Sequence, residues 1–240
     1  MTKQISNSRL IAIGDIHGHA DALESLLQMI NVQTNDTVVT LGDYVNRGPN
    51  SRRVLDLLIA LEAYCHLVPI LGNHDEMMLD SRNDVHARER WLSQGGDTTL
   101  ASYGVNAKVD DIPQEHWDFL NNCMPYFETE EFIFTHANYC WYSTMDQQPV
   151  SLLRWLSLKE SPPRPHLNGK TFIVGHTPGP IRDIGHCICL DTGCGFGGNL
   201  TAMELVTKSV WQVGEQPQKQ VVPIPEGRKR ISHLSSDANG

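Results

Sequence analysis

The sequence predicts an α/β fold in which helices pack on β-sheet. Short apolar runs of strand length alternate with amphipathic helical segments through the first 75 residues, and this βαβαβ order indicates a sheet with helices packed on it. Hydrophobic residues make up 40% of the chain, which is enough for a real core. The length of 240 residues is compatible with one large α/β domain.

The alternating elements occupy the N-terminal part of the chain. Arg9–Ile13 and Asp36–Leu41 are apolar runs that predict buried strands, and each leads directly into a Gly-Asp pair. Between them, Asp21–Ile30 carries leucine and isoleucine at helical spacing. Ser51–Leu61 predicts a second amphipathic helix, and His66–Leu71 predicts a third strand.

The remainder of the chain is expected to add a helical segment and further strands. Residues 76–125 are predicted to be mainly helical. The strands expected after them are Phe132–Thr135, Thr171–Val174, Cys187–Leu190, Leu200–Leu205 and Val210–Val213. The runs that begin at residues 187 and 200 are assigned to a second sheet. One domain is expected over residues 1–215, and the polar residues 216–240 are expected to form a flexible tail.

Charge and composition exclude several classes of function. The net charge of −9 argues against a general binder of nucleic acid or of a membrane surface, because no overall positive field would attract phosphates. No run approaches 18 apolar residues, so no membrane span is expected. The six cysteines show no CxxC spacing, and we expect free thiols in a cytoplasmic protein.

Potential metal ligands follow five of the predicted strands. They are Asp15, His17, Asp43, Asn73, His136 and His176. Any one of them could be an ordinary turn or core residue, but ligands of open α/β sheets bind beyond the carboxyl ends of strands, where these side chains can converge. A single zinc needs only three or four ligands, so the set fits two metals that share a carboxylate. Carboxylate, imidazole and amide donors suit manganese, iron or zinc.

Several short blocks resemble the phosphoprotein phosphatase family of calcineurin-like enzymes. The matching blocks are Gly14-Asp15-Ile16-His17-Gly18, Gly42-Asp43-Tyr44-Val45-Asn46-Arg47-Gly48, Gly72-Asn73-His74-Asp75, Thr135-His136-Ala137 and Gly175-His176-Thr177. Residues 190–193 and 197–201 extend the likeness to about residue 205. The resemblance implies a calcineurin-like metallophosphoesterase fold, with two packed mixed β-sheets flanked by helices. It also implies that residues 1–215 form the catalytic domain.

The resemblance implies a metal role for each matching ligand. Asp15 and His17 would bind the first metal, and Asp43 would bridge the two. The second metal would be completed by Asn73, His136 and His176. Two divalent ions are expected, with manganese first and iron or zinc as alternatives. A hydroxide that bridges them would attack phosphorus.

The resemblance also implies catalytic residues around the metals. Arg47 would hold the substrate phosphate, a role that suits a planar bidentate donor. His74 would be the general acid that protonates the leaving oxygen. Arg154, in Leu153-Arg154-Trp155, is a candidate second phosphate clamp, or else a residue of a helix surface. Asp75 follows His74 and is a further catalytic candidate, although adjacent side chains usually diverge.

One position departs from the family pattern and bears on the substrate. The family has a second Asp where this chain has Asn46, and that carboxylate pairs with the acid histidine. A neutral amide favours imidazolium less, so we expect less of His74 to be protonated and available as a general acid at neutral pH than in its family counterparts. Diadenosine tetraphosphate hydrolases, a sister branch, also lack this Asp. Gly175-His176-Thr177-Pro178 and Leu153-Arg154-Trp155 favour bacterial protein phosphatases instead.

The sequence therefore predicts a metal-dependent phosphoprotein phosphatase. Its substrates would be phosphoserine or phosphothreonine proteins, with phosphotyrosine as a further candidate, or a phosphorylated small molecule. The alternative is a symmetrical diadenosine tetraphosphate hydrolase. A third possibility is a binding module without activity, which the complete set of ligand positions argues against. The oligomeric state is left open.

Overall fold

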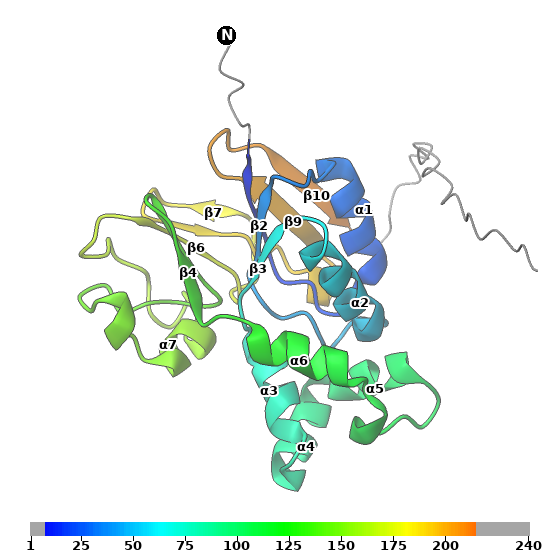
Figure 1. Ribbon diagram of the computed structural model, residues 1–240. Coiled ribbons are helices and arrows are strands. Elements are labelled where there is room, and N and C mark those ends of the chain that lie inside the picture. Colours follow the sequence, from blue (N-terminus) through cyan, green and yellow to red (C-terminus); the bar gives the residue numbers. More distant parts are fainter. Residues whose placement is uncertain (1–7, 215–240) are drawn as a thin grey trace, which may run out of the picture.

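Two five-stranded sheets pack face to face in the computed structural model, which describes residues 8–214 (Figure 1). The first sheet has the order β10-β9-β1-β2-β3. Its strands are β1 (Leu10–Ile13), β2 (Thr37–Thr40), β3 (His66–Pro69), β9 (Asn199–Glu204) and β10 (Val210–Gly214). Strands β1, β2 and β3 are parallel, whereas β9 is antiparallel to both β1 and β10.

The second sheet has the order β4-β5-β6-β8-β7. Its strands are β4 (Tyr126–Glu128), β5 (Phe132–Thr135), β6 (Thr171–Val174), β7 (Arg182–Asp183) and β8 (Cys187–Cys189). The central strands β5, β6 and β8 are parallel, and both edge strands are antiparallel to their neighbours. In both sheets, therefore, the parallel strands end at one common edge.

Alternation along the strands explains why the sheets stack. On β1, Ile11 and Ile13 face the helices, whereas Ala12 faces the other sheet. On β5, Phe134 packs between the sheets and Ile133 packs on the outer side. Because successive side chains point to opposite faces, each strand contributes to two apolar layers. The second sheet is thus covered on both faces, as expected for buried parallel strands.

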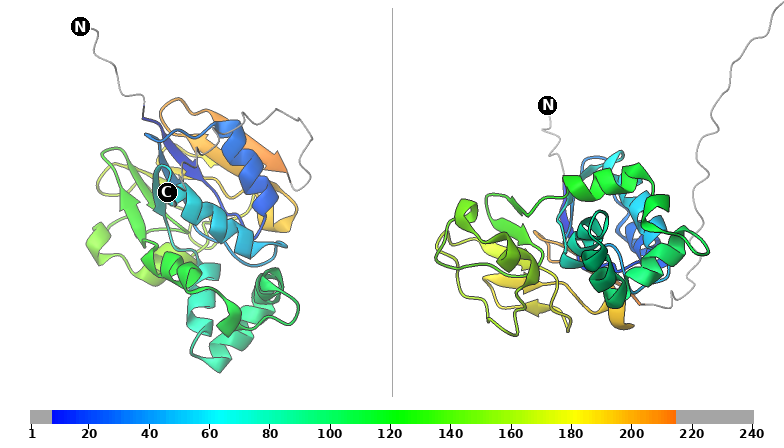
Figure 2. Two further views of the ribbon diagram at one scale, coloured as in Figure 1. Left: turned by 45° about the vertical axis from the view of Figure 1, so that its right-hand side comes forward. Right: turned by 90° about the horizontal axis from the view of Figure 1, so that it is seen from below.

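Helices cover the outer faces and one end of the sheets. Helices α1 (Ala20–Ile30) and α2 (Ser51–Glu62) lie on the first sheet and bury leucines at helical spacing. The helical lobe stands at one end of the sheets (Figure 2). It consists of α3 (Asn73–Ser81), α4 (Val85–Trp91), a kinked segment (Leu92–Gly96), α5 (Asp97–Tyr103) and α6 (Gln114–Asn122). Helix α7 (Val150–Trp155) packs beside the second sheet through Leu153.

Most predicted elements are confirmed, and one assignment is wrong. The strand expected at Leu200–Leu205 exists as β9 but belongs to the first sheet, where it pairs with β1. The loop 191–198 carries the chain from one sheet to the other, and alternation alone does not specify which neighbour a strand pairs with. Helix α3 begins at Asn73, three residues before the segment predicted to be helical. The predicted tail at 216–240 lies outside the described residues.

The structure bears on the expectations about membrane spans and about the cysteines. No helix within residues 8–214 has both the length and the hydropathy that a membrane crossing needs. All six cysteines lie in this range, and none forms a disulfide. Cys187 and Cys189 instead pack in the apolar layer outside the second sheet.

Candidate metal centre and phosphate pocket

The ends of strands from both sheets meet around a pocket of about 250 Å³. The residues that line it are Asp15, His17, Asp43, Arg47, Asn73, His74, Gln94, Trp155, His176, Pro178, Asp191 and Phe196. His136 follows β5 and lies just behind this lining, fully buried. The six predicted metal ligands are therefore brought together, although they come from segments as far apart as Asp15 and His176.

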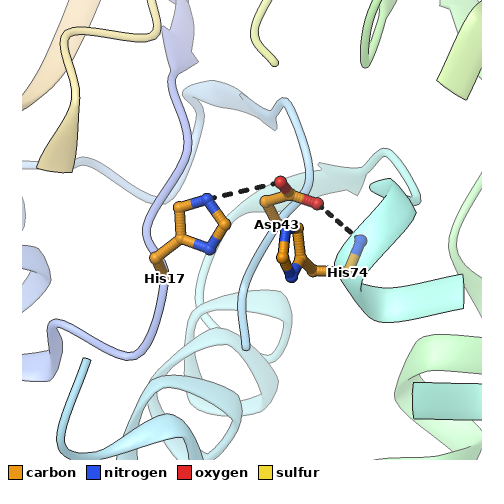
Figure 3. Close-up of side chains that lie close together, drawn as sticks. All are labelled: His17, Asp43 and His74. Carbon is orange, nitrogen blue, oxygen red and sulfur yellow. Dashed lines mark hydrogen bonds and ion pairs between the residues drawn. The ribbon is translucent and has the colours of Figure 1, made fainter. Parts of the chain in front are cut away.

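Asp43 lies at the centre of the ligand set. Its Oδ2 is 3.4 Å from Nε2 of His17, and its Oδ1 is 3.5 Å from Nε2 of His136. The same Oδ1 accepts a hydrogen bond of 2.9 Å from the backbone N–H of His74 (Figure 3). One carboxylate thus faces a histidine from each sheet, which is the position that a bridging ligand needs.

Three of the histidines are held from behind by backbone carbonyls. Nδ1 of His17 lies 3.1 Å from the Val45 oxygen, and Nδ1 of His136 lies 2.7 Å from the Leu41 oxygen. Nε2 of His176 lies 3.0 Å from the carbonyl oxygen of Trp155. A carbonyl only accepts, so each ring donates one N–H backwards and presents the lone pair of its other nitrogen to the site.

On the second-sheet side of the site, ring nitrogens of two histidines lie close to one amide oxygen. Oδ1 of Asn73 is 3.0 Å from Nε2 of His136 and 2.9 Å from Nδ1 of His176. The backbone N–H of His176 reaches both carboxylate oxygens of Asp15, at 3.2 and 3.1 Å. Asn73 comes from the first turn of α3, so the helical lobe also contributes to the ligand set.

The buried carboxylates of the site would be stabilised by positive charge. Burial, followed by repulsion from Asp191 and Asp43, raises the pKa of Asp15 well above its usual value. Burial likewise raises the pKa of Asp43 to about 7, and it also raises the pKa of Asp191. Divalent cations between these groups would relieve their mutual repulsion. The donor set therefore fits metal ions of the kind expected from the sequence.

Backbone strain concentrates in the same place. Eight non-glycine residues in the described chain have positive φ, and five of them belong to the site: His17, Asp43, Asn46, Arg47 and His176. Such conformations cost energy and persist only where the surrounding structure fixes them. Here they lie in the loops that follow β1, β2 and β6, where the chain turns sharply into the site.

Two glycines allow the carboxylates to approach the backbone closely. A Cβ at Gly175 would lie 2.1 Å from Oδ1 of Asp15, and a Cβ at Gly72 would lie 2.2 Å from Oδ1 of Asp43. Any larger residue would push either carboxylate out of place. Gly175, which precedes His176, and Gly72, which precedes Asn73, thus each have a steric reason to be glycine.

Arg47 and His74 lie together on the lobe side of the pocket. Nη1 of Arg47 is 2.7 Å from Nε2 of His17, and its Nη2 is 2.9 Å from Nε2 of His74. The guanidinium also lies 4.2 Å from the centre of the Phe196 ring. Arg47 therefore presents its donors to the pocket, beside the metal ligands.

Two further candidates lie outside the pocket lining. Asp75 points away from it and accepts backbone N–H bonds from Gly72, Asp43, Tyr44 and Val45, so it ties α3 to the loop after β2. Arg154, on α7, forms an ion pair with Glu76 of α3. Catalytic roles for these two residues stay predictions, and in the described structure both connect elements around the site.

Five residues that line the pocket were not among the sequence-based candidates. They are Gln94, Trp155, Pro178, Asp191 and Phe196. Asp191 comes just after β8, so the strand-end pattern that singled out the other acids could have found it. Gln94 lies at the kink between α4 and α5, where its φ of −104° and ψ of 21° are not helical, and no sequence pattern singled it out. No pattern in the sequence indicated Phe196.

Comparison with protein families and known proteins points to one group. The model of the calcineurin-like phosphoesterase family matches residues 8–207. Serine/threonine-protein phosphatase 1 of Salmonella typhimurium is 31% identical over 197 residues, which cover 79% of this chain and 88% of that protein. The asymmetrical bis(5'-nucleosyl)-tetraphosphatase PrpE of Oceanobacillus iheyensis is 26% identical over 256 aligned positions, which cover 95% of this chain and 96% of that protein.

A solved structure shows the same fold. The crystal structure of a candidate diadenosine tetraphosphatase superposes with a TM-score of 0.68 at 22% sequence identity. The match covers 88% of this chain and 95% of that one. The arrangement of two sheets with flanking helices is thus shared with an experimentally determined protein.

Proposed function

The chain belongs to the calcineurin-like phosphoesterase family, and from this premise we propose that it hydrolyses phosphate monoesters of phosphoproteins with the help of two divalent metal ions. The family is metal-dependent, and the described residues include two groups of His and Asp that share Asp43 and could hold metal ions. The enzyme is a metallophosphoesterase; the phosphoprotein substrate and the metal identity are the parts that we propose.

The position of Asp43 carries the proposal. Asp15, His17 and Asp43 would hold one ion, whereas Asp43 with Asn73, His136 and His176 would hold the other. When bound, such ions lower the pKa of water at the site and neutralise charge on a phosphoryl group. Manganese agrees with a set of carboxylate, amide and imidazole donors without thiolate.

The protein's own residues would bind and orient the phosphoryl group. Arg47 offers planar N–H donors, which suit two phosphoryl oxygens at once. Its ring contact with Phe196 and its hydrogen bonds limit its rotation, so less entropy is lost on binding. Nε2 of His74 accepts a hydrogen bond of 2.9 Å from Arg47, and once protonated His74 would act as the general acid for the leaving oxygen.

The size of the pocket supports a phosphomonoester on a large substrate. A volume of about 250 Å³ is below the roughly 300–1,000 Å³ typical of pockets that enclose a whole small molecule. The pocket can thus take a phosphoryl group while the rest of the substrate stays outside. The Salmonella relative is named as a serine/threonine-protein phosphatase, which agrees with this proposal.

Two features favour dinucleoside polyphosphates as a second candidate. Trp155 and Phe196 line the pocket and are 42% and 65% exposed, so nucleobases could stack on them. Asn46 is neutral and lies beside His74, and a nucleotide phosphate leaves without needing a proton. The Oceanobacillus relative is named as a bis(5'-nucleosyl)-tetraphosphatase, which agrees with this alternative.

A substrate panel would test the proposal. The purified full chain with manganese would be assayed on phosphoserine, phosphothreonine and phosphotyrosine peptides and on diadenosine tetraphosphate. We expect release of inorganic phosphate from the peptides. Cleavage of diadenosine tetraphosphate alone would replace the proposal with the second candidate. Turnover of neither class, measured against the same metal without protein, would contradict both.

A further inference from the structure

The last turn of α7 contacts both histidine segments of the second predicted metal site. The backbone N–H of Ala137, next to His136, donates a hydrogen bond of 2.7 Å to the carbonyl oxygen of Leu153. Nε2 of His176 lies 3.0 Å from the carbonyl oxygen of Trp155. Carbonyls in the last turn of a helix have no partner within that helix, so these two can accept bonds from elsewhere. Helix α7 thus supports two predicted ligand segments from behind.

Helix α7 needs tertiary contacts to hold this position. It has six residues, whereas isolated helices shorter than about 12–15 residues are marginal in water. The buried side chain of Leu153 packs it beside the second sheet. Its last two residues, Arg154 and Trp155, both direct their side chains to Glu76 of α3. The place of the last turn therefore depends on helix α3 as well as on the sheet.

The carboxylate of Glu76 binds both of these neighbouring side chains. Its Oε1 forms the ion pair with Arg154, and its Oε2 accepts a hydrogen bond of 2.6 Å from Nε1 of Trp155. Arg154 is buried, and a buried cation that loses its partner is strongly destabilised. With both oxygens in use, the carboxylate fixes the end of α7 at two points.

Helix α3 reaches the His176 ring from both sides. Asn73, the first residue of α3, places its Oδ1 2.9 Å from Nδ1 of His176. On the far side of the ring lies the carbonyl of Trp155, the residue that Glu76 holds from the first turn of the same helix. Rotation of the imidazole would break both contacts. One helical turn thus contacts this ligand directly and, through α7, supports it from behind.

We propose that Glu76 is a positioning residue for the second metal ion: by holding the end of α7, it keeps the Trp155 carbonyl behind His176 and so orients that ligand. This inference rests on the proposed function, which supplies the second ion. Groups behind a metal-binding histidine fix the orientation of its ring, and their loss typically lowers metal affinity by about 10–100-fold. Glu76 therefore acts on the metal without contacting it.

Metal binding provides the test, without reference to turnover. Manganese ions would be titrated into the metal-free full chain by isothermal titration calorimetry. We expect two ions per chain in the wild type. Glu76→Ala should weaken the binding of one ion by about 10–100-fold and leave the other unchanged. The unchanged ion would be the one held from the loops after β1 and β2, which do not depend on α7.

A milder variant covers the case in which Glu76→Ala does not fold. Trp155→Phe removes the indole N–H and keeps both an aromatic ring and the backbone carbonyl. It should weaken the same ion, but less than Glu76→Ala does. In the double variant the two losses should not multiply, because they interrupt the same contact.

An ion pair between two other helices provides the matched control. Glu24 of α1 lies 3.5 Å from Arg53 of α2, and neither residue is part of the pocket lining. Glu24→Ala removes a carboxylate from an interhelical pair, as Glu76→Ala does, but should bind both ions with wild-type affinity.

A second background separates positioning of His176 from general damage to the site. His176→Ala should bind one ion, and adding Glu76→Ala should leave the affinity for that ion unchanged. Further weakening in this background would overturn the inference. So would wild-type affinity for both ions in folded Glu76→Ala, or in Trp155→Phe if Glu76→Ala does not fold. A wild type that binds two manganese ions but releases no phosphate from any phosphopeptide would instead overturn the proposed function alone.

Discussion

The histidines on the two sides of the pocket have different groups behind their rings. On the metal side, His17, His136 and His176 each have a backbone carbonyl behind them. On the lobe side, His74 has the amide nitrogen of Asn46 behind it. An acceptor behind an imidazole turns the lone pair of the other ring nitrogen towards the pocket. His74 lies instead between two nitrogen groups, the amide of Asn46 and the guanidinium of Arg47. The partners of the ring, rather than the residue type, therefore distinguish the three predicted metal ligands from His74.

The largest effect is expected from replacing Asp43, the ligand that the two predicted metal sites share. Asp43→Asn should lower kcat/KM by at least about 10³-fold, because charge stabilisation by the metals is worth several kcal/mol. Metal content, measured by mass spectrometry, should fall below two ions per chain. Asp110→Asn changes an exposed aspartate and is the control. Two bound ions together with normal turnover would show that Asp43 is not shared.

Removing the donor on the lobe side should have a smaller effect and leave the metals bound. His74→Ala should lower kcat/KM by about 10²–10³-fold, the cost of losing one positioned donor to a developing charge. His74 also lies close enough to His17 and Asp43 to form a metal group with them. Loss of a metal ion in this variant would therefore identify His74 as a ligand and contradict the comparison. His86→Ala, at an exposed histidine, is the control.

A still smaller effect is expected from Phe196, whose replacement tests how Arg47 is held. Phe196→Ala removes the ring that lies 4.2 Å from the guanidinium. Such contacts are worth about 0.5–1 kcal/mol, so KM should rise about 2- to 5-fold while kcat stays the same. Tyr142→Ala removes an exposed aromatic ring that is not part of the pocket lining and should change neither constant. A fall in kcat would mean that Phe196 orients Arg47 in the transition state.

The smallest effect on activity is expected from the ion pair of Arg9 with Asp36, which is not part of the pocket lining. Although burial raises the pKa of Asp36, hydrogen bonds from Arg9 and Gln33 outweigh it and lower the pKa overall. Its folded pKa lies below the unfolded value of about 3.9, so the stabilisation exists above that pH and is lost as pH falls through the folded pKa. Asp36→Asn should therefore lower the free energy of unfolding by about 1–2 kcal/mol at pH 7.

Below about pH 3, the difference in stability between Asp36→Asn and the wild type should shrink, as measured by urea unfolding at each pH. At pH 7, kcat/KM should match that of the wild type. A difference that persists unchanged at low pH would show that the charge of Asp36 does not provide the stabilisation. Lowered activity in the folded variant would show that the pair influences the site.

The sequence by itself determined the elements and the candidate ligands. Apolar runs predicted strands that occur at Leu10–Ile13 and Phe132–Thr135, because alternation and run length reflect burial on a sheet. Since parallel strands end at one edge, the polar residues after them had to lie near each other. The structure brings Asp43, His136 and His176 within ligand distance of one another, as this reasoning expected.

Only the tertiary structure decided which partners each residue meets. Strand β9 pairs with β1. Arg154 forms an ion pair with Glu76 and is not part of the pocket lining. The structure also sets the indole of Trp91 against the amide oxygen of Asn46, 45 residues away along the chain, and the amide nitrogen of Asn46 against His74. Local patterns record burial and turns, but the direction of a hydrogen bond depends on the group that packing places opposite. That group comes from a distant segment, which no local pattern specifies.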